Sequence, residues 1–279
     1  MEIFSGTSSA GLGVFALGLL LTGLVGGLLA GLLGVGGGII VVPVLYHVMT
    51  VLGVDESVRM HVTIGTSLAT IIPTTYSSVV AHSRKNAVDW ALLKRWSIPM
   101  LVGVLAGSAL AAWASGRALA LVFGIVALPI AVHFAFNGES RRISDRLPGG
   151  AAGLALPVFI GGISTMMGIG GGAVGVPVMT LCGVPIHRAV GTASAFGALI
   201  SVPGTAVAIM TGWQAHALPP WSLGYVNLPG FALIAPTSFF AAPFGAEIAH
   251  MVDRRRLRKI FALFIAIISA SMLWGAPGT

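Results

Sequence analysis

Long apolar runs separated by short charged loops dominate the chain. A membrane-spanning helix needs about 20 mostly apolar residues at about 1.5 Å per residue. Runs of this length predict single spans at about residues 62–80, 98–114, 119–136, 190–210, 228–251 and 260–274. Two further runs, at about 11–52 and 149–183, are too long for one span, and we interpret each as a helical hairpin.

Each hairpin contains the same interruption. The decapeptide Gly34-Val-Gly-Gly-Gly-Ile-Ile-Val-Val-Pro43 recurs as Gly168-Ile-Gly-Gly-Gly-Ala-Val-Gly-Val-Pro177, at an offset of 168 − 34 = 134 residues. Three consecutive glycines interrupt a helix, since glycine loses the most backbone freedom there. In lipid the released N–H and C=O groups must be buried in protein or face water. Paired interruptions in corresponding places are typical of the binding site of a secondary transporter.

The duplication extends beyond the glycines. Ile64-Gly-Thr-Ser67 aligns with Val190-Gly-Thr-Ala193, and Pro99, Ser108, Ala111 and Ala112 align with Pro229, Ser238, Ala241 and Ala242. We therefore expect a first membrane repeat over residues 1–137, a linker over 138–148 and a second repeat over 149–279. Each repeat is predicted to be a glycine-broken hairpin plus three transmembrane helices.

The basic loops predict the orientation of these repeats. Lys and Arg concentrate in residues 84–95, 139–146 and 253–259, which places these loops in the cytoplasm, whereas the loop at 212–227 has no charged residue and should be external. This pattern requires each hairpin to enter and leave on one side. The two repeats are then inverted relative to each other, an architecture for alternating access, with the N-terminus and the C-terminus both external.

Composition excludes a water-soluble globule. The chain is 56% hydrophobic and 8% charged, whereas a soluble domain carries about 25% charged residues. The fold class is therefore an all-α polytopic membrane protein, with lipid as its surroundings. The net charge of +7 lies in short loops, so we interpret it as a topology signal rather than a nucleic-acid surface.

The glycine motifs are candidate anion sites. The helices expected at 39–45 and 173–181 begin directly after them, and unpaired N–H groups at helix N-termini attract anions. The alternative is that the glycines only let helices pack closely. Hydroxyls at the starts of the following spans could complete such a site, or could bond within and between helices. The candidate substrate-binding residues are Gly36, Gly37, Gly38, Thr66, Ser67, Gly170, Gly171, Gly172, Thr192 and Ser194.

Ionisable residues within the predicted spans are few. His133 lies deep in one span, and Glu247 and His250 share a helix face at i, i+3, so these three are candidates for proton coupling. Glu247 could instead meet Arg254 or lipid headgroups. The remaining histidines are interpreted as boundary residues without metal-ligand spacing; they are His47, His61, His82, His187 and His216.

No catalytic set is found in the sequence, and we expect neither an enzyme nor a cofactor. The segment Gly34–Gly38 lacks the Gly-Lys-Ser/Thr ending of a phosphate-binding loop, which argues against an ATP-driven pump. Cys182 is the single cysteine, so an intrachain disulfide is excluded. The aromatic residues on membrane-facing sides suit either lipid or a second copy of the chain, and homo-oligomerisation therefore stays open.

The chain resembles the sulfite exporter TauE/SafE family of bacterial inner-membrane permeases. The resemblance rests on both Gly-x-Gly-Gly-Gly-x4-Pro copies, on His187-Arg-Ala-Val-Gly-Thr192, on Leu223-Gly-Tyr-Val-Asn-Leu228, and on the segments Ala242–Ala246 and Leu257–Phe261. It implies export of sulfite, an organosulfonate or another small anion. A permease for small carboxylates, an anion channel and a non-transporting membrane subunit are the alternatives. The second repeat departs from the first at Ala193, so Ser194 is expected to supply its hydroxyl.

Overall fold

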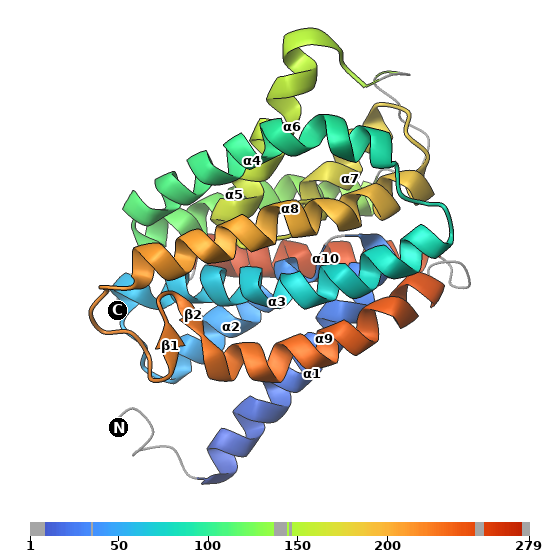
Figure 1. Cartoon of the computed structure of the whole chain (residues 1–279). Coiled ribbons are helices and arrows are strands. Elements are labelled where there is room, and N and C mark those ends of the chain that lie inside the picture. Colours follow the sequence, from blue (N-terminus) through green and yellow to red (C-terminus); the bar gives the residue numbers. More distant parts are fainter. Residues whose placement is uncertain (1–8, 35, 137–143, 145–146, 249–253, 275–279) are drawn as a thin grey trace.

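The protein is an all-α bundle, seen in a computed structural model that describes residues 9–34, 36–136, 144, 147–248 and 254–274 (Figure 1). The first half contributes α1 (Ser9–Leu33), α2 (Gly38–Val51), α3 (Glu56–Arg84), α4 (Trp90–Trp113) and α5 (Gly116–Phe136). The second half contributes α6 (Gly150–Met167), α7 (Gly172–Leu181), α8 (Ile186–Gly212), α9 (Leu228–Ile248) and α10 (Arg254–Trp274). The predicted fold class, an all-α polytopic membrane protein, is confirmed.

The glycine motifs divide both predicted hairpins into two helices. α1 ends at Leu33 and α2 begins at Gly38, while α6 ends at Met167 and α7 begins at Gly172. The loop predicted at 212–227 is more ordered than expected, because it contains a short antiparallel hairpin of β1 (Ser222–Leu223) and β2 (Val226–Asn227). Two-residue strands are too short to leave a recognisable alternation in the sequence.

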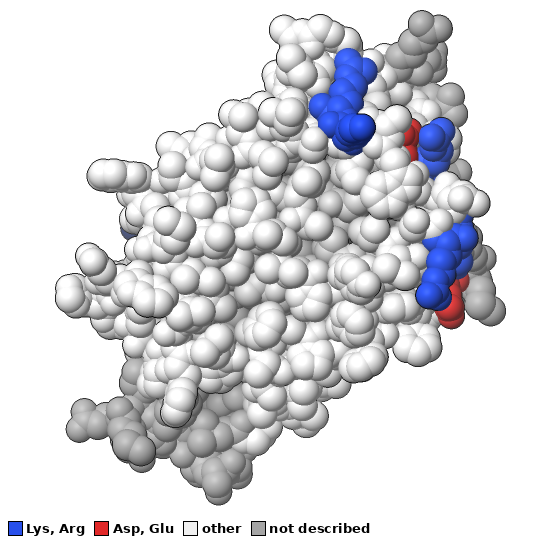
Figure 2. Space-filling model, in the orientation of Figure 1, with Lys and Arg blue, Asp and Glu red and all other residues white. Residues whose placement is uncertain are grey.

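The sides of the bundle suit lipid. Among the residues that the structure describes, five helices are long and apolar enough to cross a membrane, namely α1 from Gly13, α4, α6, α8 and α9. Large apolar side chains such as Ile98, Met210 and Phe240 are exposed on these sides. Charged side chains gather along the right-hand edge in Figure 2, where Figure 1 places the connection between α3 and α4. This segregation is expected of a protein whose sides face hydrocarbon and whose ends face water.

Helix α3 is long but is not among these five, because its sequence is rich in threonine and serine. It lies in the middle of the bundle, packed against α2, α8 and α9. Most of its central residues are buried, including Thr63, Thr66, Ser67 and Thr70. Its polar residues therefore face protein instead of lipid, where neighbouring helices can accept their hydrogen bonds.

Helices of the first half pack against helices of the second half. α1 packs most extensively against α9, and α6 packs against α4, while α3 lies beside α8 and α5 beside α10. α1 and α9 run in the same direction, since Gly23 faces Ile234 and Gly31 faces Ala242. α3 and α8 run in opposite directions, since Gly65 faces Ala208 and Gly197 faces Thr75. These directions support the predicted inverted repeats, which we treat below as a proposal.

Glycine sets the distance between α1 and α9. A methyl group on Gly31 would overlap the Ala242 carbonyl oxygen, whereas one on Gly18 of the same helix would meet nothing within 4 Å. We predict that Gly31→Ala lowers stability by about 1–3 kcal/mol, as overpacking does, and that Gly18→Ala does not. Melting curves of the two purified variants test this. Equal melting temperatures would show that the two helices can move apart at no cost.

Candidate functional site

The two glycine interruptions meet at the centre of the bundle. A methyl group on Gly36 would lie 2.9 Å from the Cα atom of Gly170, and one on Gly170 would lie 3.2 Å from the Cα atom of Gly36. The outer ends of the motifs make reciprocal contacts: Gly34 faces Val190 of α8, and Gly168 faces Ile64 of α3. Residues 134 positions apart are thus brought into direct backbone contact, which only glycine permits here.

The start of each short helix requires glycine for a second reason. Gly37 precedes α2 with φ 69°, and Gly171 precedes α7 with φ 78°, a left-handed conformation that side chains disfavour. α2 and α7 begin at Gly38 and Gly172, one residue before the starts expected from the sequence. The N–H of Gly38 donates to the Gly36 carbonyl at 2.8 Å, so the turn itself occupies one of the donors predicted to bind an anion.

One predicted hydroxyl holds the second motif in place. Ser67 donates its hydroxyl hydrogen to the carbonyl oxygen of Gly168 at 2.7 Å, and its side chain is fully buried. The residue at the equivalent place in the second half is Ala193, which offers no such donor. Ser194 instead donates to the Gly191 carbonyl of its own helix at 2.7 Å.

Thr66 and Thr192 each accept a hydrogen bond from the backbone of a segment that connects two helices. The backbone N–H of Asn227 donates to the Thr66 hydroxyl at 2.8 Å, and that of Asp89 donates to the Thr192 hydroxyl at 2.9 Å. Asn227 and Asp89 in turn accept, through their side chains, backbone N–H groups at the starts of α9 and α4. The two threonines therefore occupy equivalent positions and fix opposite connections, away from the glycine contact.

Asp89 also carries an electrostatic link between the halves. Arg188 of α8 donates to its carboxylate at 2.9 Å. The Arg188 side chain is 55% exposed and that of Asp89 is 25% exposed, so water screens the pair and its contribution to stability is small. It lies on the basic side of the molecule, with Lys94 and Arg95 nearby in sequence.

A pocket borders the glycine contact, and we call it the hydroxyl pocket. In this conformation it is a closed gap without room for a water molecule, and it is lined by Ala30, Gly36, Thr74, Thr75, Ser78 and Ser194. The Ser78 hydroxyl is buried and has no hydrogen-bond partner among the described residues. A buried hydroxyl without a partner is costly, so the Ser78 hydroxyl would favour a ligand in a conformation in which this gap is wider. The pocket brings two predicted residues, Gly36 and Ser194, together with four that the sequence analysis did not select, three of which carry hydroxyls.

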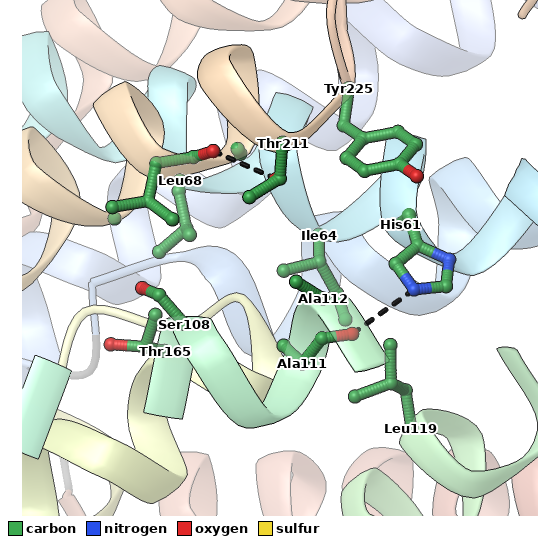
Figure 3. A pocket seen from close by; sticks show the side chains of 13 residues that line it. His61, Ile64, Leu68, Ser108, Ala111, Ala112, Leu119, Thr165, Thr211 and Tyr225 are labelled. Atoms are coloured by element: carbon green, nitrogen blue, oxygen red, sulfur yellow. Dashed lines mark hydrogen bonds between the residues drawn. The ribbon is translucent and has the colours of Figure 1, made fainter. Parts of the chain in front are cut away.

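A second pocket lies on the other side of the glycine contact, and we call it the His61 pocket (Figure 3). Along α3, His61, Ile64 and Leu68 line this pocket, whereas Thr74, Thr75 and Ser78 line the hydroxyl pocket. Ile71 lies between the two sets and is buried against Gly38 and Gly170. The glycine contact and Ile71 together separate the two pockets.

The candidates for proton coupling lie elsewhere. Glu247 is exposed on α9 and lines neither pocket. The side chains of His133 and His250 lie outside the described residues. Within the described part of the chain, His, Cys, Asp and Glu side chains form no group of three or more that could hold a metal ion.

Two of the residues missed by the sequence analysis, Thr74 and Ser78, share one signal. Thr70, Thr74 and Ser78 recur every four residues along the second half of α3, which places them on one helix face. Hydroxyls at helical spacing within a predicted span could have identified this face. His61 carried no such signal, because its position at the end of a run is common for a boundary residue.

Known proteins are similar to this chain over nearly its whole length. The family model described as sulfite exporter TauE/SafE matches residues 19–272. A "Probable membrane transporter protein" of Haemophilus influenzae is 30% identical, covering 92% of this chain and 98% of the relative. A protein of Methanocaldococcus jannaschii with the same description is 25% identical, covering 91% of this chain and 94% of the relative. YunE of Bacillus subtilis, also described as a probable membrane transporter protein, is 27% identical, covering 92% of this chain and 96% of the relative. No solved structure matches the chain.

The two threonine contacts make a prediction about stability. Thr66→Val and Thr192→Val each leave a backbone N–H without its acceptor, and such a loss costs about 1–3 kcal/mol. Thr50→Val is the matched control, because exposed Thr50 bonds only within its own helix. Melting temperatures should fall for the first two variants and stay unchanged for the control. Unaltered stability with impaired transport would instead assign these threonines to substrate binding.

Proposed function

Because the chain belongs to the sulfite exporter TauE/SafE family, we propose that this membrane transporter moves a small anion, sulfite or an organosulfonate, out of the cell by alternating access. We place it in the bacterial inner membrane with both termini external. At an interior potential of −100 mV, the exit of one negative charge is favoured by about 2.3 kcal/mol. Export of a monoanion then requires no ATP.

The observation that carries this proposal is the contact between Gly36 and Gly170 beside the hydroxyl pocket. The starts of α2 and α7 adjoin this contact, so the positive ends of both helix dipoles favour a negative charge nearby. None of the described residues that line the pocket is Lys, Arg, Asp or Glu. Neutral donors attract an anion while holding it less firmly than an ion pair would, which suits a site that must release its substrate.

We assign the substrate site to Gly36–Gly38, Gly170–Gly172 and Ser194, and we add Thr75 and Ser78. Ser67 belongs to this site as the residue that fixes the second motif through Gly168. The exchanged pairing of α1 with α9 and of α6 with α4 supports two bodies that could rock about α3 and α8. The two pockets, separated by Ile71, are what we expect of a path closed at its centre.

Three alternatives predict different behaviour. A carboxylate permease would prefer acetate to sulfite, and an anion channel would conduct current without coupling to a substrate gradient. A non-transporting subunit would show no flux for any anion. His133, Glu247 and His250 remain candidates for proton coupling, which requires flux to depend on a pH gradient and on Glu247.

The first experiment is anion flux in proteoliposomes of the purified protein, with sulfite, ethanesulfonate or acetate inside. We predict that Ser78→Ala lowers the flux of the preferred anion about fivefold, the size of one hydrogen bond of about 1 kcal/mol. This variant removes no hydrogen bond described within the protein, so it should fold. Ser77→Ala is the control, because Ser77 is a buried neighbour that bonds the Thr74 carbonyl and does not line the pocket.

Selective flux that falls with Ser78→Ala and persists with Ser77→Ala supports the proposed site. Flux that both variants leave intact would remove the hydroxyl pocket from the transport path. The absence of flux for every anion would overturn the transporter mechanism itself.

A further inference from the structure

Two connecting segments lie at opposite ends of the bundle (Figure 1). The first connector, residues 85–89, joins α3 to α4, and the second, residues 213–227, joins α8 to α9 and contains β1 and β2. The proposed substrate site uses neither of them. Both connectors are nevertheless held on the two central helices, α3 and α8, by backbone contacts of the same kind.

The first connector packs on the start of α8. A methyl group on Gly191 would overlap the Ala87 carbonyl oxygen, so glycine is required for this close approach. The next residue, Thr192, accepts the backbone N–H of Asp89 at 2.9 Å. The connector therefore lies beside Ser194, which donates to the Gly191 carbonyl and lines the hydroxyl pocket.

The second connector packs on the start of α3 in the same way. A methyl group on Gly65 would overlap the Tyr225 carbonyl oxygen, and Thr66 accepts the backbone N–H of Asn227 at 2.8 Å. Tyr225 also donates its backbone N–H to the Ala208 carbonyl of α8, and Tyr225 and Ala208 both line the His61 pocket. This connector therefore reaches from α3 to α8 and forms part of the wall of that pocket.

The two contacts correspond in the duplication, and we call them the Gly-Thr contacts. Their glycines are related by 191 − 65 = 126 residues and their connector residues by 225 − 87 = 138 and 227 − 89 = 138. In each contact the glycine meets a carbonyl, and the threonine accepts the N–H two residues later. That later residue then accepts, through its side chain, a backbone N–H at the start of the next helix. The same atoms recur in both halves, which indicates a shared role.

We propose that the two Gly-Thr contacts are the gates of the transport path, and that Asp89 and Asn227 position the connectors that close them. Opening the gate at Gly191 uncovers the hydroxyl pocket, and opening the gate at Gly65 uncovers the His61 pocket. Both gates are closed here, on either side of the contact between the glycine motifs, so this conformation is occluded. Alternating access then requires the gates to open in turn. The assignment rests on the proposed function.

The gates differ in charge. At the first, Arg188 of α8 donates to the Asp89 carboxylate at 2.9 Å, so an ion pair between the halves adds to the backbone contact. At the second, Asn227 is neutral and its amide donates to the Pro220 carbonyl within its own connector at 3.3 Å. Only the first gate is therefore joined to the opposite half by a charged pair within the described residues.

The test is labelling of single cysteines by a membrane-impermeant thiol reagent, in membrane vesicles of either orientation. Ser78→Cys reports on the hydroxyl pocket and Ser108→Cys on the His61 pocket, in a Cys182→Ser background. Both serine hydroxyls are buried without a partner among the described residues, so neither reporter removes a described hydrogen bond. Gly191→Ala and Gly65→Ala each set a methyl group against one connector and hold that gate open.

We expect Gly191→Ala to raise the labelling rate of Ser78→Cys at least about fivefold, because overpacking of this kind shifts a two-state equilibrium by at least that factor. Gly65→Ala should do the same for Ser108→Cys, from the opposite face of the membrane. Each variant should leave the other reporter protected. Gly18→Ala is the control, because its methyl group would meet nothing within 4 Å, and it should change neither rate.

Thr192→Val and Thr66→Val remove one hydrogen bond of each gate without a clash. They should raise labelling of the same reporters by a smaller factor, and they decide the question if an alanine variant does not fold. Unchanged labelling, or a rise at both reporters in one variant, would overturn the gates. If that result came with intact anion flux, the proposed transport would stand. Labelling from opposite faces with no flux of any anion would refute transport and leave two connectors that open separately.

Discussion

The structure depends on hydrogen-bond partners for the backbone N–H and C=O groups at the breaks of two helices inside a membrane. Lipid offers no hydrogen-bond partners, so groups freed at a break must find them within the protein. The first motif does so through its own turn, where Gly34 donates to Ala30 and Gly38 to Gly36. The second uses Thr165, Ser164 and the Ser67 hydroxyl. Burying both breaks against each other keeps them from lipid and places them between α3 and α8.

Much of the fold follows from hydropathy and the glycine doubling. The sequence predicted helices in every apolar run, two breaks at the glycines and an all-α membrane protein, and the structure has each of them. The exact ends were less predictable. α3 begins at Glu56, six residues before the predicted span, because Asp55 caps it and its polar residues face protein. Hydropathy reports whether a segment suits lipid, and α3 is mostly surrounded by other helices.

The candidate site was only partly predictable, since a side chain's partner can lie far away in the chain. Thr66 bonds to a residue 161 positions later, and Thr192 to one 103 positions earlier. The sequence identified both as polar residues in the right helices but could not distinguish a ligand contact from a loop contact. Ser78 and His61 were missed because each is distinguished by a buried polar atom without a hydrogen-bond partner among the described residues. That property can be seen only in the three-dimensional structure.

The difference between Ser67 and Ala193 has a consequence for the energy balance of the two halves. In a perfectly duplicated protein, the inward-facing and outward-facing conformations would be related by two-fold symmetry and would have equal free energies. Here only the second glycine motif accepts a hydrogen bond from a serine at this position, because Ser67 donates to Gly168 and Ala193 has no hydroxyl. Such a hydrogen bond is worth about 1 kcal/mol. If the halves exchange roles as we propose, that inequality alone shifts the populations about fivefold toward the fastened conformation. An ancient duplication would then have acquired a built-in resting direction by the presence of one oxygen atom.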